Sequence, residues 1–158
     1  MPTDNNPAWN TSADLATFID SFSRYELPTE AVETARTCVI DTLGVTIAGA
    51  ETDASSIAAT ALAGQASTGP VTVIGHDRTA PLPTASFING IAAHALDYDD
   101  FSYAYPAHPS AVIATVALAT AEANDRTGRN VLEAYIVGFE TYYYLAKIIG
   151  DNHYENGW

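Results

Sequence analysis

The most informative stretch of this chain reads Asn89-Gly-Ile-Ala-Ala-His-Ala-Leu-Asp-Tyr-Asp-Asp-Phe-Ser-Tyr-Ala-Tyr-Pro-Ala-His-Pro-Ser110. An alanine-rich helical pattern runs into three carboxylates, an aromatic loop follows, and His108 precedes a Pro-Ser pair that opens the next apolar run. Proline is preferred at the first position of a helix, so a new helix is expected to begin at Pro109. The stretch therefore predicts two helices joined by a loop that has carboxylates at one end and a histidine at the other.

The two ends of this loop have different local electrostatics. Asp97 falls where the first helix should end, at the negative pole of its dipole and beside Asp99 and Asp100, and both effects favour the protonated acid. His108 lies at the positive pole of the next helix, which favours the neutral imidazole. Free backbone N–H groups from Ser110 onward could hold a substrate carboxylate there. The arrangement suits proton abstraction beside a carboxylate, with Asp97 and His108 as the candidate catalytic residues.

Simpler and rival interpretations remain open from the residues alone. Asp99 and Asp100 could be solvated loop carboxylates, with His108 merely the N-cap of its helix. His94, three residues before Asp97 on the same helix face, could orient that carboxylate or be an ordinary cation at a helix end. Asp97-Tyr-Asp-Asp100 also matches the Asp-x-Asp-Asp acid of class II terpene cyclases, and three close carboxylates could hold Mg²⁺ or Ca²⁺. The resemblance to the terpene cyclase motif leaves His108-Pro-Ser unexplained. We therefore predict no metal ligand among these residues.

Helical periodicity extends over most of the chain. Apolar residues at helical spacing follow Ser12, and a longer helix begins at Leu27–Glu30 with an inward stripe that reaches Ile47. Further helices are predicted at 57–62, 84–96, 109–123 and 130–149, with one β-branched strand at 71–75. We expect an all-α protein, a helical bundle with at most one short β-strand or hairpin. Residues 1–158 should form a single helical domain with flexible ends at 1–11 and 150–158.

Composition narrows the classes of partner. The net charge is −13 over 158 residues, which argues against nucleic acid and anionic membranes. Abundant acid with few lysines suggests a salt-rich, halophilic cytoplasm, in which ionic strength screens self-repulsion. No signal peptide or membrane span is recognised, since the most apolar run ends at Glu122. The expected location is the cytoplasm.

The central motif resembles that of the MmgE/PrpD family, which includes 2-methylcitrate dehydratases, cis-aconitate decarboxylases and iminodisuccinate epimerases. The resemblance is carried by Ala93-His-Ala-Leu-Asp-Tyr-Asp-Asp100 followed by His108-Pro-Ser. Other stretches are similar in the same order: Asp41-Thr-Leu-Gly44, Tyr135-Ile-Val-Gly-Phe-Glu140 and His153-Tyr-Glu-Asn-Gly-Trp158. The similarity covers nearly the whole chain from about Leu15.

This resemblance implies a lyase that acts on a small di- or tricarboxylate without a metal or organic cofactor, and a homodimer. Asp97 and His108 would line the active site and share the proton transfers for loss of water, or for loss of CO₂ or epimerisation in the alternative activities. Many members have threonine where this chain has Phe101, so the hydroxyl role could pass to Ser102. The predicted substrate-binding residues are Ser102, Ser110, Asp100 and His94.

The resemblance also predicts that the chain is the N-terminal portion of a longer protein. A second active-site histidine would follow directly after Trp158, and the later lysines and tyrosine of the family site have no counterpart here. The expected alternative of another class is a non-catalytic helical module that keeps an oligomerisation surface.

Overall fold

A computed structural model describes residues 12–22, 27–62, 68–103, 106–149 and 155–157. These residues form α1 (Ser12–Phe22), α2 (Thr29–Gly49), α3 (Asp53–Ala61), α4 (Leu82–His94), α5 (Pro109–Ala123) and α6 (Gly128–Ile149), with two short strands, β1 (Val71–Thr72) and β2 (Thr79–Ala80). The predicted mainly helical class is confirmed. The ends predicted to be flexible lie outside the described residues, except for 155–157.

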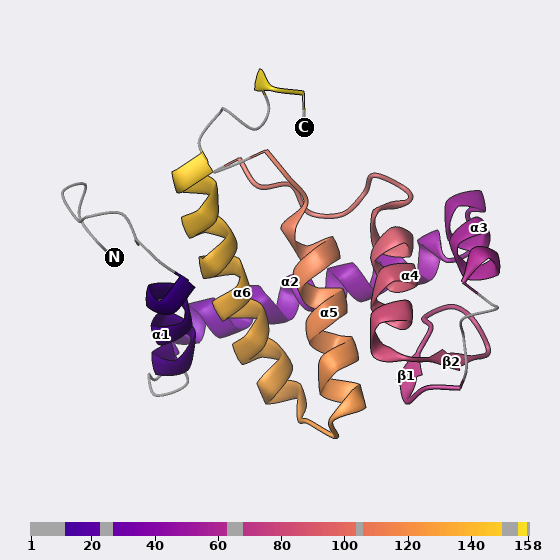
Figure 1. Ribbon diagram of the computed structural model, residues 1–158, viewed down its shortest axis with the longest axis horizontal. Helices are drawn as coiled ribbons and strands as arrows, with labels where there is room; N and C mark the ends of the chain where they lie inside the picture. The colour runs from indigo at the N-terminus through magenta and orange to yellow at the C-terminus, as the bar shows by residue number, and fades with distance from the viewer. Residues whose placement is uncertain (1–11, 23–26, 63–67, 104–105, 150–154, 158) are drawn as a thin grey trace.

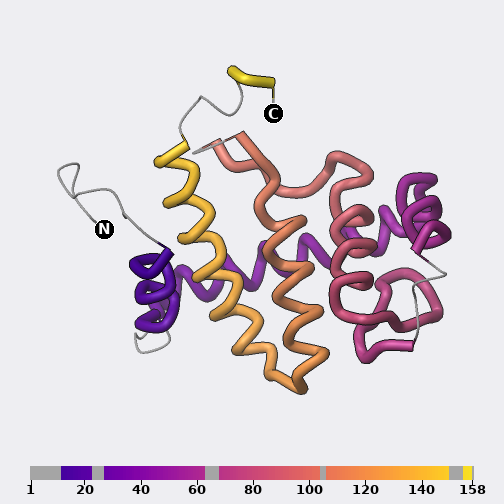
Figure 2. The backbone as a smooth tube through the Cα atoms, viewed as in Figure 1, coloured from indigo at the N-terminus to yellow at the C-terminus, as the bar shows by residue number. Residues whose placement is uncertain are grey.

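Three successive helices form one layer and α2 crosses it. Figure 1 shows α4, α5 and α6 side by side, each running opposite to the one before. α2 runs across all three behind this layer and contacts each of them. Figure 2 follows the chain from the end of α4 across the same end of the layer to the start of α5. The candidate functional loop therefore lies at one end of the helical layer. No helix in the described part of the chain has the length and hydrophobicity that a membrane span needs.

The observed helix bounds follow local sequence signals. α5 begins at Pro109 and ends at Ala123 as predicted, with His108 at the N-cap position. α4 spans Leu82–His94, two residues earlier at each end than the predicted 84–96. α3 begins at Asp53 rather than residue 57, because the Thr52 hydroxyl accepts a hydrogen bond from the Ser55 N–H and starts the helix earlier.

The predicted strand at 71–75 is the first half of a small hairpin. Val71 pairs with Ala80 and Thr72 with Thr79 in antiparallel register. The Asn89 side chain on α4 accepts a hydrogen bond from the Ile74 N–H at 2.9 Å and donates one to the Thr72 carbonyl at 3.0 Å. The hairpin is thereby fixed to the helix that leads into the functional loop.

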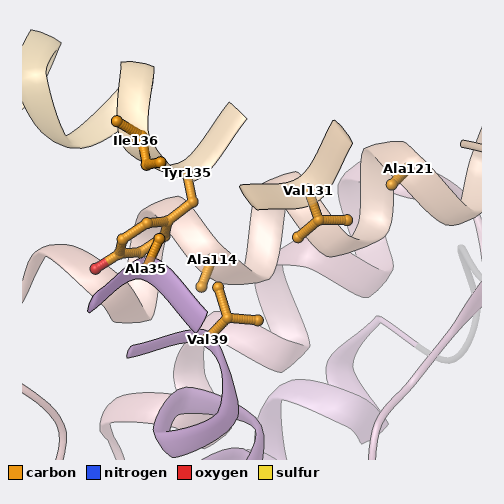
Figure 3. Close-up of a cluster of buried hydrophobic side chains, with 7 residues drawn as sticks. All are labelled: Ala35, Val39, Ala114, Ala121, Val131, Tyr135 and Ile136. Atoms are coloured by element: carbon orange, nitrogen blue, oxygen red, sulfur yellow. The ribbon is translucent and has the colours of Figure 1, made fainter. Parts of the chain in front are cut away.

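Two hydrophobic clusters stabilise the layer. One joins α2, α5 and α6; Figure 3 shows its members Ala35, Val39, Ala114, Ala121, Val131, Tyr135 and Ile136. The other joins the hairpin, α3 and α4 around Val71, Val73 and Ile88. Small residues let the helices approach closely: a Cβ on Gly49 of α2 would lie 2.0 Å from the Ala92 carbonyl oxygen of α4.

Candidate functional site

The loop between α4 and α5 turns sharply at Asp97. Asp97 has φ of 50°, in the left-handed region that aspartate tolerates better than most residues. Its N–H donates to the His94 carbonyl at 3.0 Å, which closes a turn at the end of α4. The turn brings the chain back, so that Asp99 lies against the side chain of His94.

Asp99 is a buried carboxylate between two imidazoles. Its side chain is 1% exposed. Asp99 Oδ1 lies 3.0 Å from His94 Nδ1 and 3.3 Å from His108 Nδ1. The two imidazole rings are 4.5 Å apart between centroids. The interpretation of Asp99 as a solvated carboxylate is therefore wrong.

His108 presents its other ring nitrogen to Asp97. His108 Nε2 lies 3.6 Å from Asp97 Oδ1, and the Asp97 side chain is 80% exposed. Although His108 holds the N-cap position of α5, its side chain makes no capping hydrogen bond. Phe101 packs edge-on against the His108 ring, with centroids 5.5 Å apart. His108 is thus a side chain held between two carboxylates, and a role as a simple N-cap does not describe it.

We refer to these four side chains as the His–Asp cluster: His94, Asp97, Asp99 and His108. The nitrogen and oxygen atoms that they offer all lie within 4.8 Å of one another. Sequence reasoning named His94, Asp97 and His108 as site residues but missed the importance of Asp99. No periodicity could have shown it, because Asp99 lies beyond the end of α4 and its position depends on the turn at Asp97.

Asp100 faces a different set of partners. It accepts hydrogen bonds from the Ser110 N–H at 3.1 Å and from the Ser110 hydroxyl at 2.7 Å. The Ser110 hydroxyl is in turn 2.6 Å from the Tyr135 hydroxyl. Because Ser110 uses its proton toward Asp100, Tyr135 is the donor in the second bond. The prediction of a free Ser110 N–H for a substrate carboxylate is wrong, since Asp100 already occupies it.

Tyr135 completes this chain of hydrogen bonds from inside the core. Burial raises the pKa of the Tyr135 hydroxyl well above its ordinary value, and the hydrogen bond with Ser110 opposes that rise only in part. The phenol therefore keeps its proton and remains a donor. Sequence reasoning assigned Tyr135 no role, yet a tyrosine on the inward face of an apolar helix signals a buried hydroxyl that needs a partner.

The remaining predicted residue, Ser102, stabilises the loop through its backbone. Its N–H donates to the Ala107 carbonyl at 3.0 Å. Phe101 brings an aromatic ring to the cluster and no hydroxyl. The three carboxylates do not converge either, because Asp100 is turned toward Ser110 while Asp97 and Asp99 face the histidines. The three-carboxylate Mg²⁺ or Ca²⁺ site considered above is therefore not formed.

A cavity of about 420 Å³ lies beside this network, between α2 and α6. Asp100 and Tyr135 line part of it, together with Cys38 and mostly apolar side chains of both helices. None of the His–Asp cluster lines this cavity. The His–Asp cluster and the cavity are thus separate features; the cavity has carboxylates of its own, Glu30, Asp100 and Glu140, but no imidazole.

Comparison with known proteins gives consistent results. Residues 13–158 match the model of the MmgE/PrpD N-terminal domain. The chain is similar to a cis-aconitate decarboxylase-like protein, oryM, of Aspergillus oryzae, with 27% identity over 88% of this chain and 30% of the relative. It is also similar to human cis-aconitate decarboxylase, with 32% identity over 80% of this chain and 27% of the relative. The chain thus spans less than a third of the length of these relatives.

Proposed function

Because the chain belongs to the MmgE/PrpD family, we propose that it supplies the His108 part of a lyase site that acts on a small di- or tricarboxylate. The observation that carries the proposal is the environment of His108. One ring nitrogen faces the buried Asp99, and the other faces the exposed Asp97 at 3.6 Å.

This environment suits general acid–base catalysis. The buried Asp99 carboxylate lies 3.3 Å from His108 Nδ1, and its negative charge favours the tautomer whose proton lies on Nδ1, although the contact is not aligned as a hydrogen bond. Nε2 is then the nitrogen that takes or gives a proton. Asp97, exposed beside it, is placed to exchange a proton with the same substrate. Phe101 limits the motion of the ring from one side.

Two reactions use this proton transfer in different ways. In decarboxylation, a carbon–carboxylate bond breaks to release CO₂, and the electron pair left on carbon takes a proton from the acid. In dehydration, the base removes a proton from carbon, the electron pair forms the double bond, and hydroxide leaves with a second proton as water. Both printed names of the relatives favour decarboxylation of cis-aconitate as the first reaction to test, with dehydration of 2-methylcitrate as the second.

The test uses the protein at its full natural length. Release of CO₂ from cis-aconitate and loss of 2-methylcitrate are followed separately. We expect turnover of one substrate, reduced by about 10² or more in His108→Gln. His76→Gln is the matched control, because His76 lies on the hairpin outside the cluster. Unchanged turnover in His108→Gln would contradict the proposal, and no turnover of either acid would favour a non-catalytic helical module.

A further inference from the structure

The His–Asp cluster also has the composition and spacing of a metal site, although the sequence predicts none. It brings together two imidazoles and two carboxylates from the end of α4, the loop and the residue before α5. His94 and His108 are fourteen positions apart in the sequence, outside the short spacings by which a histidine pair on one helix is recognised. Only the turn at Asp97 places them on either side of Asp99.

The distances within the cluster match those between ligands of one small ion. A tetrahedral Zn²⁺ with ligands at about 2.0–2.2 Å has ligand atoms about 3.3–3.5 Å apart. Two contacts share Asp99 Oδ1 and measure 3.0 Å to His94 Nδ1 and 3.3 Å to His108 Nδ1, and one ligand atom from each of the four residues lies within 4.8 Å of the others. The longer separations can shorten by side-chain rotation, because the side chains of His94 and Asp97 are 51% and 80% exposed.

A second observation points to a missing ligand beside His108. Its Nδ1 atom is buried and has no hydrogen-bond partner among the described residues, because the 3.3 Å contact with Asp99 is not aligned as a hydrogen bond. Buried polar atoms are almost always paired, so an unpaired ring nitrogen beside a buried carboxylate calls for an explanation. A cation bound by both atoms, in exchange for the Nδ1 proton, would pair the nitrogen and the carboxylate together.

Charge and ligand type define the ion. Asp97 and Asp99 neutralise a divalent cation, and the net charge of −13 attracts cations to the surface. Imidazole nitrogen suits Zn²⁺ and the neighbouring transition metals, whereas Mg²⁺ and Ca²⁺ prefer six or more oxygen ligands. We propose that the His–Asp cluster binds one Zn²⁺-type ion through His94, Asp97, Asp99 and His108. This binding does not depend on the proposed function; a bound ion would occupy the side chains that the lyase chemistry needs and would inhibit it.

The experiment is calorimetric titration of the purified, chelator-treated 158-residue chain with ZnCl₂, and with MgCl₂ in parallel. We expect one saturable Zn²⁺ site per chain and no comparable binding of Mg²⁺. His94→Ala and Asp97→Asn should each weaken Zn²⁺ binding by at least about tenfold. Loss of a residue that only supports a ligand already costs about 10- to 100-fold in metal affinity, so loss of a ligand should cost no less. Both side chains are at least half exposed, so the variants should fold, which circular dichroism checks.

Two control variants separate this site from adventitious binding. His76→Ala removes a histidine outside the cluster, and Cys38→Ser removes the single thiol. Neither should change Zn²⁺ affinity. The proposal is overturned by the absence of a one-to-one Zn²⁺ site, by equal affinity for Mg²⁺, or by loss of binding in either control while His94→Ala still binds. Because no substrate is present, these outcomes are independent of whether the lyase proposal holds.

Discussion

Three aspartates within four positions have three different surroundings. The Asp97 side chain is 80% exposed at the mouth of the loop, and that of Asp99 is 1% exposed between two histidines. Asp100 is held by Ser110, which Tyr135 supports in turn. Asp97 is thus free to meet a substrate, Asp99 orients imidazoles, and Asp100 fixes the start of α5. Three identical side chains therefore have different roles, because the turn at Asp97 leaves one exposed and directs the other two toward different partners.

The Tyr135 hydroxyl gives a prediction at this scale. Tyr135→Phe keeps the ring in the core but removes the hydrogen bond to Ser110, so the free energy of unfolding should fall by about 1 kcal/mol. Urea unfolding measures it. Tyr103→Phe is the matched control, because Tyr103 is 93% exposed and should leave the stability unchanged. Equal effects in the two variants would show that the Tyr135–Ser110 bond contributes nothing.

The sequence predicted part of the site and missed the rest for a physical reason. Asp97 and His108 could be named because each stands at a helix end, where dipole and capping rules apply. The burial of Asp99 and the Ser110–Asp100 bond depend on a single left-handed residue in the loop, Asp97. The sequence identifies Asp97 as a site residue. It does not indicate the left-handed backbone conformation of Asp97, because no glycine stands at that position.

At the scale of elements, the crossing of α2 and α4 depends on backbone contact. Gly49 lies against the Ala92 carbonyl at a distance that no side chain would fit, whereas Gly44, one and a half turns earlier on α2, faces open space. α4 ends at His94, so its packing on α2 also sets the position of one residue of the His–Asp cluster. The fold thereby positions the site through small residues rather than large ones.

The two glycines give a paired prediction. Gly49→Ala should destabilise the protein by about 1–3 kcal/mol, because a methyl group forces the helices apart. Gly44→Ala should instead stabilise it by up to about 1 kcal/mol through helix propensity alone. Urea unfolding of both variants checks the pair. A Gly49→Ala protein as stable as Gly44→Ala would mean that α2 and α4 do not approach closely in solution.

Helix bounds were predictable where a residue imposes them. The predicted bounds of α5 are correct at both ends, because Pro109 begins the helix and a turn at residues 124–125 follows it. The predicted start of α3 is too late, because periodicity locates an apolar face but does not reveal that Thr52 caps the helix five residues before Ile57, its first large apolar side chain. The pairing of the hairpin likewise depends on long-range bonds to Asn89 that no local pattern shows.

At the scale of the whole molecule, charge should control stability. The net charge is −13, and the described ion pairs that involve arginine lie within helices, Arg36 with Glu33 and Arg129 with Glu133. Such surface pairs contribute little, so self-repulsion is largely unopposed at low salt. This supports the proposal of a protein adapted to high ionic strength.

A salt titration tests that proposal. Below about 0.1 M KCl the chain should lose helicity and compactness, and molar KCl should restore both, because the Debye length shortens from about 10 Å to about 3 Å. Far-UV circular dichroism follows the change. Helicity that stays constant across the range would remove the argument for halophilic adaptation.

Exposed apolar side chains predict self-association. Phe87 on α4 is 58% exposed, and Val112 and Val116 on α5 are 66% and 44% exposed. Such surfaces are typical of faces that meet another segment or subunit. The purified chain should therefore scatter light as an oligomer, and the double variant Val112→Ser, Val116→Ser should shift it toward the monomer. A wild-type chain that stays monomeric at all concentrations would contradict this prediction.

The most direct test of the account compares variants of three aspartates in the protein at its full natural length. Asp97→Asn should lower kcat by about 10² or more with little change in Tm, because its side chain is 80% exposed. Asp99→Asn should lower kcat as well, since it withdraws the carboxylate beside His108 Nδ1. Asp77→Asn, on the exposed hairpin turn, should change neither quantity. Equal kcat values in all three variants would contradict the claim that the His–Asp cluster is the site of proton transfer.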